Sequence, residues 1–293
     1  MTNLKKKNVA IIGTGNIGCD LMMKTMRSPY LNCSLMTGRN LDSLGSRFAM
    51  QKHISVSDLS IAAIQENPDI CDIVFDATSA AVHHKNALIL RELNKFVVDL
   101  TPAKIGMMCV PVINLKDALD TDNINLITCG GQASIPIAHA ISKVHPETSY
   151  IEIVSTIASK SAGIGTRDNI DEFIQTTKDA LAHFTGIENT KAIITLNPAE
   201  PPINMRTTIY AVIKNPNMDA IRKNVFETTE KIKKYVPGYK VIIEPTLENE
   251  RIITTIEVTG LGDYLPSYAG NLDIITCAAI RIAEAYAQKY EVK

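Results

Sequence analysis

The sequence predicts an α/β protein with a parallel sheet in its N-terminal part and a second domain of α+β type. Up to about residue 130, short apolar runs alternate with helical patterns, which is typical of βαβ units. Further along, the strand patterns alternate between apolar and polar residues, as expected for sheets with one buried face. The chain has 293 residues, and single cores usually split beyond about 250, so we expect two domains.

The strands of the first domain are predicted from almost continuous apolar runs, because strands of a parallel sheet are buried on both faces. The expected strands are Asn8–Ile12, Leu31–Thr37, Asp72–Thr78, Phe96–Leu100 and Ile124–Thr128, and the helices between them include Ile17–Met26 and Val82–Leu93. We place this domain at residues 1–130.

The second domain is expected at residues 131–270, with a mixed or antiparallel sheet. Its strands are predicted at Tyr150–Ser159, Lys191–Leu196, Thr207–Ile213, Lys240–Ile243 and Ile252–Val258, and its helices at Ile135–Val144, Asn169–Phe184 and Met218–Tyr235. A last helix, Leu272–Tyr290, is rich in alanine. We expect it to return to the first domain, so that residues 271–293 complete that domain.

The composition excludes several classes of protein. Hydrophobic residues make up 45% of the chain and charged residues 21%, which is ordinary for a globular protein. The formal net charge of −1 does not favour nucleic acid or a membrane surface as a partner. No apolar stretch approaches the roughly 20 residues that span a bilayer, and we expect a cytoplasmic protein. The six cysteines lack the spacing of a zinc site or a disulfide framework, so no metal is expected.

A dinucleotide fingerprint follows the first predicted strand. Gly13, Thr14, Gly15, Asn16, Ile17 and Gly18 form the pattern G-x-G-x-x-G and open a predicted helix. The first glycine makes a tight turn, the second lets the backbone approach a pyrophosphate, and the third lets helix and strand pack closely. The helix N-terminus then offers N–H groups to the phosphates. We therefore predict a Rossmann-type domain that binds NAD or NADP.

The choice between the two cofactors stays open. The acidic residue that usually binds the ribose 2′-hydroxyl lies about 20 residues after the fingerprint, but here the segment contains Arg39 and Asn40. Arg39 can pair with a 2′-phosphate, which favours NADP. A solvated arginine, or one stacked on adenine, is equally compatible with NAD.

Cys129 is the candidate nucleophile. It follows a predicted strand and precedes a predicted helix, and ligands of open α/β sheets bind at the carboxyl ends of strands. A helix N-terminus lowers the pKa of a thiol, and the thiolate is the reactive form. Gly130 and Gly131 allow close approach and can direct N–H groups at an oxyanion. A buried structural cysteine is the alternative.

Motifs along almost the whole chain resemble the acylating acetaldehyde dehydrogenases, the partners of 4-hydroxy-2-oxovalerate aldolases in aromatic degradation. Many motifs in the right order are more specific than one glycine loop. The motifs are residues 13–18, Asp99-Leu100-Thr101-Pro102-Ala103, Cys109-Val110-Pro111-Val112, residues 128–133, residues 161–163 and 165–167, residues 169–173, Asn197-Pro198-Ala199-Glu200-Pro201-Pro202 and Tyr268-Ala269-Gly270-Asn271-Leu272-Asp273.

The resemblance implies a reaction and a set of residues. A thiolate at Cys129 attacks an aldehyde, hydride passes to the nicotinamide, and coenzyme A takes the acyl group from the resulting thioester. It also implies a homodimer and an aldolase-type partner. The residues implied to lie along the cofactor are Lys160, Ser161, Ala162, Gly163, Ile164, Gly165, Thr166 and Arg167, with Asn271 near the nicotinamide. The reverse reaction, reduction of an acyl thioester, is also implied.

Two departures from the family pattern bear on activity. The family usually carries an aspartate, thought to act as a base, where this chain has Thr207 after Arg206. It commonly has an acidic residue where this chain has Asn40. A semialdehyde-type dehydrogenase with another acyl acceptor and a non-catalytic, aldolase-supporting subunit therefore remain alternatives.

The positions of three histidines indicate structural roles. His83 and His84 are adjacent on a predicted helix and point in different directions, so we expect a surface or interface role. His139 is expected in the core or at an interface, because it lies about two turns along the helix after Cys129.

Asp168 is a candidate replacement for the missing base, and a solvated helix cap is the alternative. If it acts on Cys129, the Asp168→Ala variant should slow the acylation half-reaction about tenfold or more, since general bases contribute at least that much. The measurement is the pre-steady-state burst of reduced cofactor. An unchanged burst would leave the aspartate as a cap.

Overall fold

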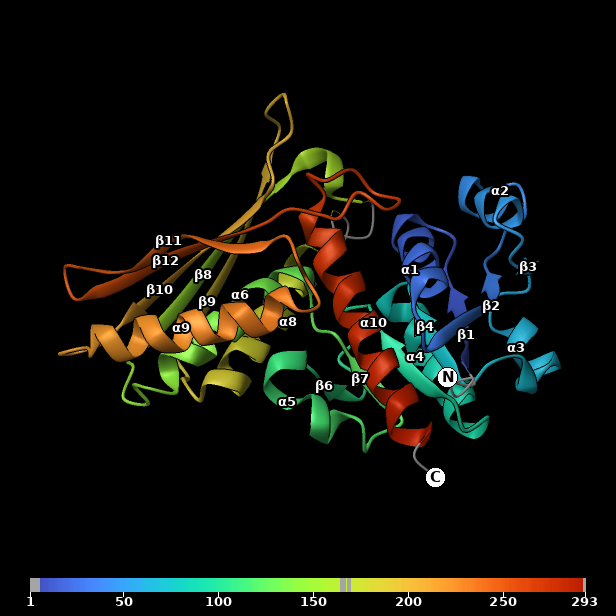
Figure 1. The fold of residues 1–293 in the computed structure, drawn as a ribbon, viewed down its shortest axis with the longest axis horizontal. Coiled ribbons are helices and arrows are strands. Elements are labelled where there is room, and N and C mark those ends of the chain that lie inside the picture. The colour runs from blue at the N-terminus through green and yellow to red at the C-terminus, as the bar shows by residue number, and fades with distance from the viewer. Residues whose placement is uncertain (1–5, 164–166, 168–169, 292–293) are drawn as a thin grey trace. The chain divides into compact units, whose positions relative to one another are not determined.

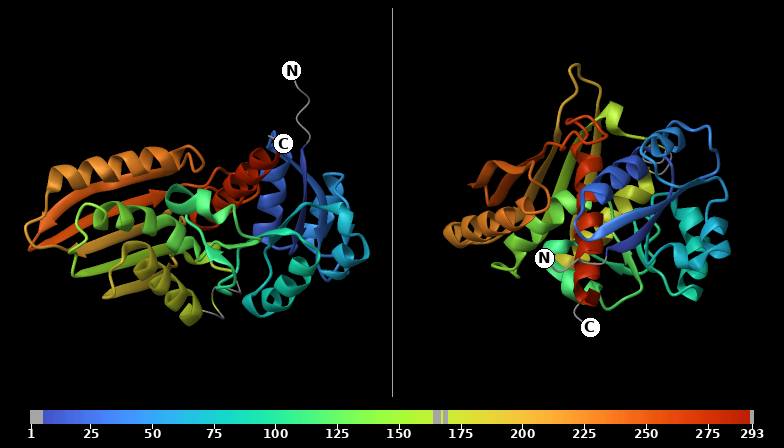
Figure 2. Two further views of the ribbon diagram at one scale, coloured as in Figure 1. Left: turned by 90° about the horizontal axis from the view of Figure 1, so that it is seen from below. Right: turned by 45° about the vertical axis from the view of Figure 1, so that its right-hand side comes forward.

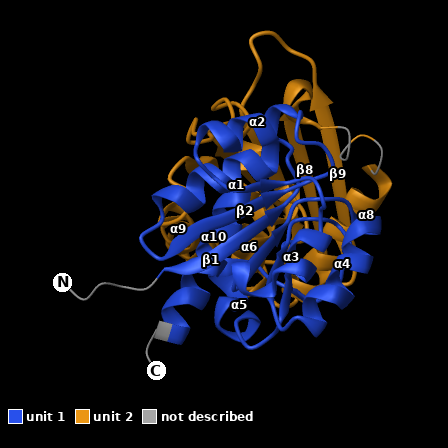
Figure 3. Cartoon of the chain, turned by 90° about the vertical axis from the view of Figure 1, so that its right-hand side faces the viewer, with its two compact units in different colours: residues 1–126, 276–293 blue, residues 127–275 orange. Residues whose placement is uncertain are grey.

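The computed structural model describes residues 6–163, 167 and 170–291 and divides the chain into two compact units (Figure 3). The first unit comprises Met1–Leu126 and Thr276–Lys293, and the second comprises Ile127–Ile275. The sequence patterns place the limits of the second domain a few residues inside these, at 131 and 270.

The first unit alternates strands and helices through most of its length (Figure 1). Its strands are β1 (Lys7–Ile12), β2 (Leu31–Thr37), β3 (Val56–Ser57), β4 (Ile73–Asp76), β5 (Phe96–Asp99), β6 (Met107–Met108) and β7 (Asn123–Asn125). Its helices are α1 (Asn16–Arg27), α2 (Leu44–Gln51), α3 (Ala62–Glu66), the 3-10 turn η1 (Pro68–Ile70), α4 (Ala80–Glu92) and α5 (Pro111–Ala118).

All seven strands form one parallel sheet in the order β3-β2-β1-β4-β5-β7-β6. The strand order reverses between β1 and β4, which is the switch point where ligands bind in open α/β sheets. Val9 to Ile12 of β1 are completely buried, as the continuous apolar run predicts. The expected α/β class is confirmed; the two-residue strands β3 and β6 were too short to be recognised from apolar runs.

The C-terminal helix α10 (Gly270–Glu291) joins the first unit from Thr276 onward. Tyr286 stacks on Phe96 of β5 with ring centroids 3.8 Å apart, and Glu284 accepts a hydrogen bond from Ser28 at 2.6 Å. Thr276 donates to the buried carboxylate of Asp20 at 2.6 Å. These contacts explain why a helix far along the sequence completes the N-terminal fold, as expected.

The described residues of the second unit form one sheet and three long helices. Its helices are α6 (Cys129–Ser142), the 3-10 turn η2 (Ser159–Ser161), α8 (Ile170–Thr185) and α9 (Met218–Lys233). Its strands are β8 (Tyr150–Ala158), β9 (Thr190–Asn197), β10 (Met205–Val212), β11 (Tyr239–Glu248) and β12 (Arg251–Val258).

The five strands of this unit form a mixed sheet in the order β11-β12-β10-β8-β9, in which only β8 and β9 are parallel. Helices α6, α8 and α9 lie on one face of it (Figures 1 and 2). Alternate residues such as Ile153, Thr207 and Ile209 are buried under these helices, while Thr208 and Tyr210 on the other face are half-buried. None of the helices described is both long and apolar enough to cross a membrane.

The start of α6 differs from the sequence prediction. We expected a helix from Ile135, but α6 begins six residues earlier at Cys129. The Thr128 hydroxyl caps it by accepting a hydrogen bond from Gly131 N at 2.9 Å. Gly130 and Gly131 have poor helix propensity and concealed this start, and tertiary packing overrides that propensity.

Candidate active site

The first and third glycines of the fingerprint are required by the fold of the first unit itself. Gly13 has φ +122°, and a Cβ there would lie 2.6 Å from the Ala77 carbonyl oxygen. A Cβ on Gly18 would lie 1.9 Å from the Gly13 carbonyl oxygen. Both positions therefore exclude larger residues by contact with backbone, as the fingerprint predicts.

The fold of the first unit does not itself require a glycine at position 15. It is the N-cap of α1 with φ −84°, a conformation that any residue adopts, and a Cβ at this position would meet no described heavy atom within 4 Å outside its neighbours in the chain and its own helix. No side chain of the described residues caps this helix end. The open space and the uncapped N–H groups fit a pyrophosphate lying over Gly15.

The loop after β2 runs beside the fingerprint. A Cβ on Gly38 would lie 2.7 Å from Thr14 Cγ2, so the next residue, Arg39, emerges next to the fingerprint turn. Arg39 and Asn40 are exposed, and Asn40 Oδ1 accepts a hydrogen bond from Asp42 N at 2.8 Å. An exposed guanidinium at this place suits either a 2′-phosphate or an adenine ring.

Cys129 is the first residue of α6 in the second unit. The chain enters the helix through Ile127, which has φ +64°, a strained value for a β-branched residue that costs of order 1–3 kcal/mol. Thr128 then caps α6, and its hydroxyl also lies 2.7 Å from the Thr177 hydroxyl of α8. This turn fixes the sulfur at the N-terminal end of the helix.

Burial dominates the electrostatics of the Cys129 thiol. It raises the pKa of Cys129 to about 12, against the backbone N–H groups of Gly130 and Cys129, which lower it. The expectation that the helix N-terminus lowers the pKa of the Cys129 thiol below its ordinary value is wrong for the buried sulfur in this structure. Desolvation of the sulfur outweighs two amide dipoles, so the thiol is neutral at pH 7.

The Gly131 N–H is not available to an oxyanion, because it donates to the Thr128 hydroxyl. Gly130 is packed closely: a Cβ there would lie 3.2 Å from Phe173 Cζ of α8 and 3.3 Å from Ser155 Oγ of β8. Ser155 Oγ lies 3.0 Å from Thr207 Oγ1 of β10, and both hydroxyls are buried. The hydroxyl pair behind Gly130 escaped sequence analysis because only strand register brings residues 155 and 207 together.

The predicted glycine loop is partly described. Lys160 forms an ion pair with Glu200 at 2.5 Å, with both side chains more than half exposed. Arg167 donates to the Ser159 carbonyl and hydroxyl oxygens at 2.8 Å each. Ser161 and Ala162 are buried and Gly163 is exposed. Ile164, Gly165, Thr166 and Asp168 lie outside the described residues.

Asn271, predicted near the nicotinamide, is 2% exposed. Its Nδ2 donates to the Ser161 carbonyl oxygen at 3.4 Å, while its Oδ1 is buried without a hydrogen-bond partner among the residues described. An unsatisfied buried carbonyl oxygen is costly, and a carboxamide N–H of a ligand would satisfy it. The second unit therefore contains an acceptor that suits a nicotinamide.

The prediction for His83 is wrong, although His84 is exposed as expected. His83 is completely buried, with Nδ1 2.9 Å from Asp76 Oδ2. The usable signal in the sequence was an aspartate at the end of each of two buried apolar runs. His139 is partly buried, and its Nδ1 lies 2.7 Å from the Phe184 carbonyl oxygen, which agrees with a core role.

Two family models match the chain. "Semialdehyde dehydrogenase, NAD binding domain" matches residues 8–120, and "Prokaryotic acetaldehyde dehydrogenase, dimerisation" matches residues 129–266. The acetaldehyde dehydrogenase of Pectobacterium atrosepticum is 56% identical over 97% of both chains. The chain belongs to the acetaldehyde dehydrogenase family. The acetaldehyde dehydrogenase of Geobacillus stearothermophilus is 51% identical over 97% of both chains, so the resemblance seen in the motifs is confirmed.

A solved structure shares the fold of this family member at low sequence identity. Aspartate semialdehyde dehydrogenase II of Vibrio cholerae, complexed with ASA, has a TM-score of 0.66 and 13% identity, covering 98% of this chain and all of that one. The likeness concerns the fold alone.

The glycine at position 15 provides a test of cofactor approach. The Gly15→Ala variant should fold as the native protein does, since its methyl group meets no described atom. It should bind the reduced dinucleotide about tenfold or more weakly, because the methyl group occupies the path of the pyrophosphate. The measurements are the thermal midpoint and a fluorescence titration with NADH and NADPH. Unchanged affinity for both would place the phosphates elsewhere.

Proposed function

We propose that the protein is a coenzyme A-acylating aldehyde dehydrogenase, which oxidises acetaldehyde or a similar short-chain aldehyde with NAD or NADP. The observation that carries the proposal is the placement of Cys129 at the first position of α6, in a chain with an open dinucleotide fingerprint. The relatives named acetaldehyde dehydrogenase support the choice of aldehyde.

Cys129 forms the covalent intermediate in this proposal. Its thiolate adds to the aldehyde carbon, and the resulting hemithioacetal loses a hydride and its hydroxyl proton to become a thioester. Bound NAD or NADP supplies the hydride acceptor. The thiol of coenzyme A then adds to the acyl carbon and gives up its proton to solvent, and the bond from the acyl carbon to the Cys129 sulfur breaks to release acyl-coenzyme A and the Cys129 thiolate. The reverse sequence would reduce an acyl thioester.

The Cys129 thiol must lose its proton before it can react, so a nearby group or solvent must accept that proton. The pKa of Cys129 is about 12 because the sulfur is buried, and the N–H groups of Gly130 and Cys129 stabilise the thiolate once it forms. The hydroxyls of Ser155 and Thr207, which pack behind Gly130, are not bases at neutral pH. The proton must therefore leave to solvent or to Asp168, and acylation should accelerate as the pH rises.

Cofactor and cosubstrate contacts are proposed on the residues described above. In the first unit, Gly15 and the N-terminus of α1 are proposed to take the pyrophosphate, with Arg39 at the adenosine end. In the second unit, the unsatisfied Asn271 Oδ1 is an acceptor of the kind that a nicotinamide amide needs. Lys160 and Arg167 are proposed to line the same cofactor. Arg39 leaves NAD and NADP as alternatives that binding measurements decide.

The proposed macromolecular partner is first a second copy of the chain. Residues 129–266 match a family model named for dimerisation, and one face of the sheet in that unit has no helix of its own over it among the described residues. The half-buried Thr208 and Tyr210 lie on that face. An aldolase-type partner that supplies the aldehyde remains part of the proposal, and co-purification from the native host tests it.

The decisive experiment follows reduced-cofactor absorbance with acetaldehyde, with and without coenzyme A. The native protein should turn over only when coenzyme A is present. The Cys129→Ser variant should lose about 10³-fold or more of this activity, because a serine hydroxyl is a far weaker nucleophile. Turnover without coenzyme A would instead indicate a semialdehyde-type enzyme. Cofactor binding without any turnover would indicate a non-catalytic subunit.

Placing a carboxylate at position 207 tests thiol activation. The Thr207→Asp variant should raise the acylation burst at pH 7 by about 10²-fold, since a positioned base contributes about that factor. It should also flatten the pH dependence, which in the native protein rises toward tenfold per pH unit because the thiol pKa is about 12.

The matched control is Asn215→Asp, which puts the same charge at an exposed position in the loop after β10. It should leave the burst unchanged. If the Thr207→Asp protein is folded but shows the native burst and the native pH slope, a carboxylate at position 207 does not take the proton from the Cys129 thiol.

A further inference from the structure

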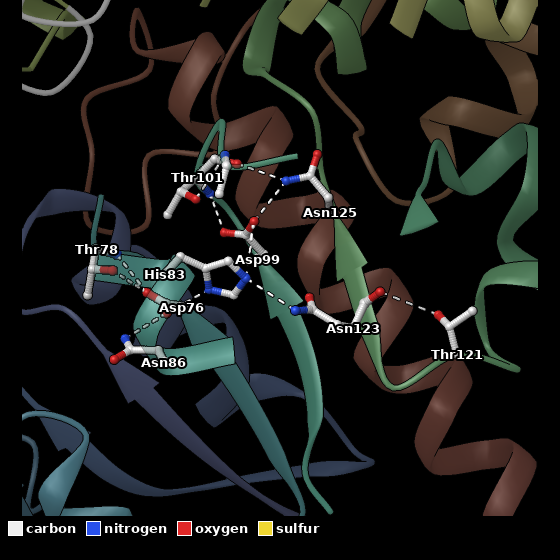
Figure 4. Close-up of polar contacts among 10 residues, drawn as sticks. Asp76, Thr78, His83, Asn86, Asp99, Thr101, Thr121, Asn123 and Asn125 are labelled. Atoms are coloured by element: carbon white, nitrogen blue, oxygen red, sulfur yellow. Dashed lines mark hydrogen bonds and ion pairs between the residues drawn. The ribbon is translucent and has the colours of Figure 1, made fainter. Parts of the chain in front are cut away.

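A buried polar cluster occupies the carboxyl ends of three adjacent strands in the first unit (Figure 4). Asp76 ends β4, Asp99 ends β5, and Asn123 and Asn125 belong to β7. His83, from the first turn of α4, lies between the two aspartates. His83, Asp76 and Asp99 are all 0% exposed, so water does not screen them.

The imidazole of His83 contacts both carboxylates. Nδ1 lies 2.9 Å from Asp76 Oδ2 and Nε2 lies 3.4 Å from Asp99 Oδ2. Asn123 Nδ2 lies 3.2 Å from Nε2, and its Oδ1 has no hydrogen-bond partner among the described residues. Turning this amide over places the oxygen toward Nε2, which then donates to it. An imidazolium with two N–H donors is the form that suits this environment.

Each carboxylate also accepts hydrogen bonds that favour its charged form. Asp76 accepts from Thr78 N at 3.1 Å and from Asn86 Nδ2 at 2.9 Å. Asp99 accepts from Thr101 N at 2.7 Å and from Asn125 Nδ2 at 2.8 Å. Two carboxylates and one imidazolium therefore form a closed ionic network. Its donors are backbone N–H groups of the loops after β4 and β5, together with Asn86 of α4 and Asn125 of β7.

The network is continuous with the dinucleotide fingerprint. Asp76 precedes Ala77, whose N–H donates to the Ile12 carbonyl oxygen at 2.8 Å and whose own carbonyl oxygen is the atom that excludes a side chain at Gly13. Leu100 N donates to the Asp76 carbonyl oxygen at 3.0 Å. The loops after β4 and β5 therefore lie at the switch point, on the half of the sheet that takes the second mononucleotide of a dinucleotide.

We propose that His83 is a positioning residue for the cofactor: by bridging Asp76 and Asp99, it holds the loops after β4 and β5 in the conformation that receives the nicotinamide half. Without the imidazolium, two buried carboxylates face each other across a gap and repel, and the loops that carry Thr78 and Thr101 shift. The adenosine half would lie near β2 and the loop with Arg39, outside the reach of this network.

The charge state of this network, and with it the proposed bridge through His83, depends on pH. The charged groups facing His83 are Asp76 from β4 and Asp99 from β5, while β7 and α4 present the neutral Asn123 and Asn86. Burial lowers the pKa of His83, but Asp76 and Asp99 together raise it above its ordinary 6.5, so the bridge is lost as the pH rises through that raised value. Burial raises the pKa of Asp99 to about 6, so the bridge is also lost below that pH.

The test uses calorimetry to compare the affinities for two ligands, the preferred reduced dinucleotide and ADP. If the preferred dinucleotide carries a 2′-phosphate, the ADP used carries one as well. The His83→Gln variant should bind the dinucleotide about tenfold more weakly, and ADP should change less than twofold, because only the nicotinamide half depends on the bridge. His84→Gln, which changes the exposed neighbour, is the matched control and should leave both affinities unchanged.

The pH profile separates positioning from a general loss of structure. Native affinity for the dinucleotide should be highest between about pH 6 and the raised pKa of His83. His83→Gln should lose the alkaline decline, and Asp99→Asn should lose the acidic one.

Equal loss of both ligands in His83→Gln, or a native affinity that is flat across this range, overturns the proposal. The native profile needs no variant, so it tests the proposal even if a variant fails to fold. All readouts are binding equilibria, and they are independent of whether Cys129 carries an acyl group.

Discussion

The parallel arrangement of the first sheet is the constraint on which the rest depends. Parallel strands bring every carboxyl end to one edge, so the residues that end β1, β4, β5 and β7 must share that edge. Gly13, Asp76, Asp99 and Asn125 follow or end these strands. A cluster of this kind is stable only if each buried charge has donors or a counter-charge, and the turns after β4 and β5 supply them from their own N–H groups. The turns that satisfy the aspartates are thereby fixed next to the fingerprint.

Two effects in the second unit shift the pKa of the Cys129 thiol in opposite directions. The N-terminus of α6 favours a thiolate at Cys129, whereas burial of the sulfur favours the neutral thiol. Desolvation is the larger effect, so the direction of the pKa shift is upward. Full reactivity therefore requires a proton acceptor that the described side chains around Gly130 do not provide.

Sequence patterns predicted the α/β class, the positions of the main strands along the chain and the place of the fingerprint, because continuous apolar runs and glycine spacing are local signals. They also placed Cys129 between strand and helix. They failed where the determinant was distant in sequence. The start of α6 depends on a cap and on packing, and Ser155 meets Thr207 only through the register of β8 and β10. His83 is buried because two strand ends supply carboxylates, a fact that helical periodicity around residue 83 does not contain.

The neutral state of the Cys129 thiol has a consequence for the resting protein. Peroxides and disulfides react with thiolates and only slowly with thiols, and Cys129 as a residue is only 8% exposed. A sulfur held protonated and covered is protected from sulfenic acid formation and from mixed disulfides with small cellular thiols. Oxidative inactivation at this position should accordingly be confined to the moments when the covering residues part and the proton is removed.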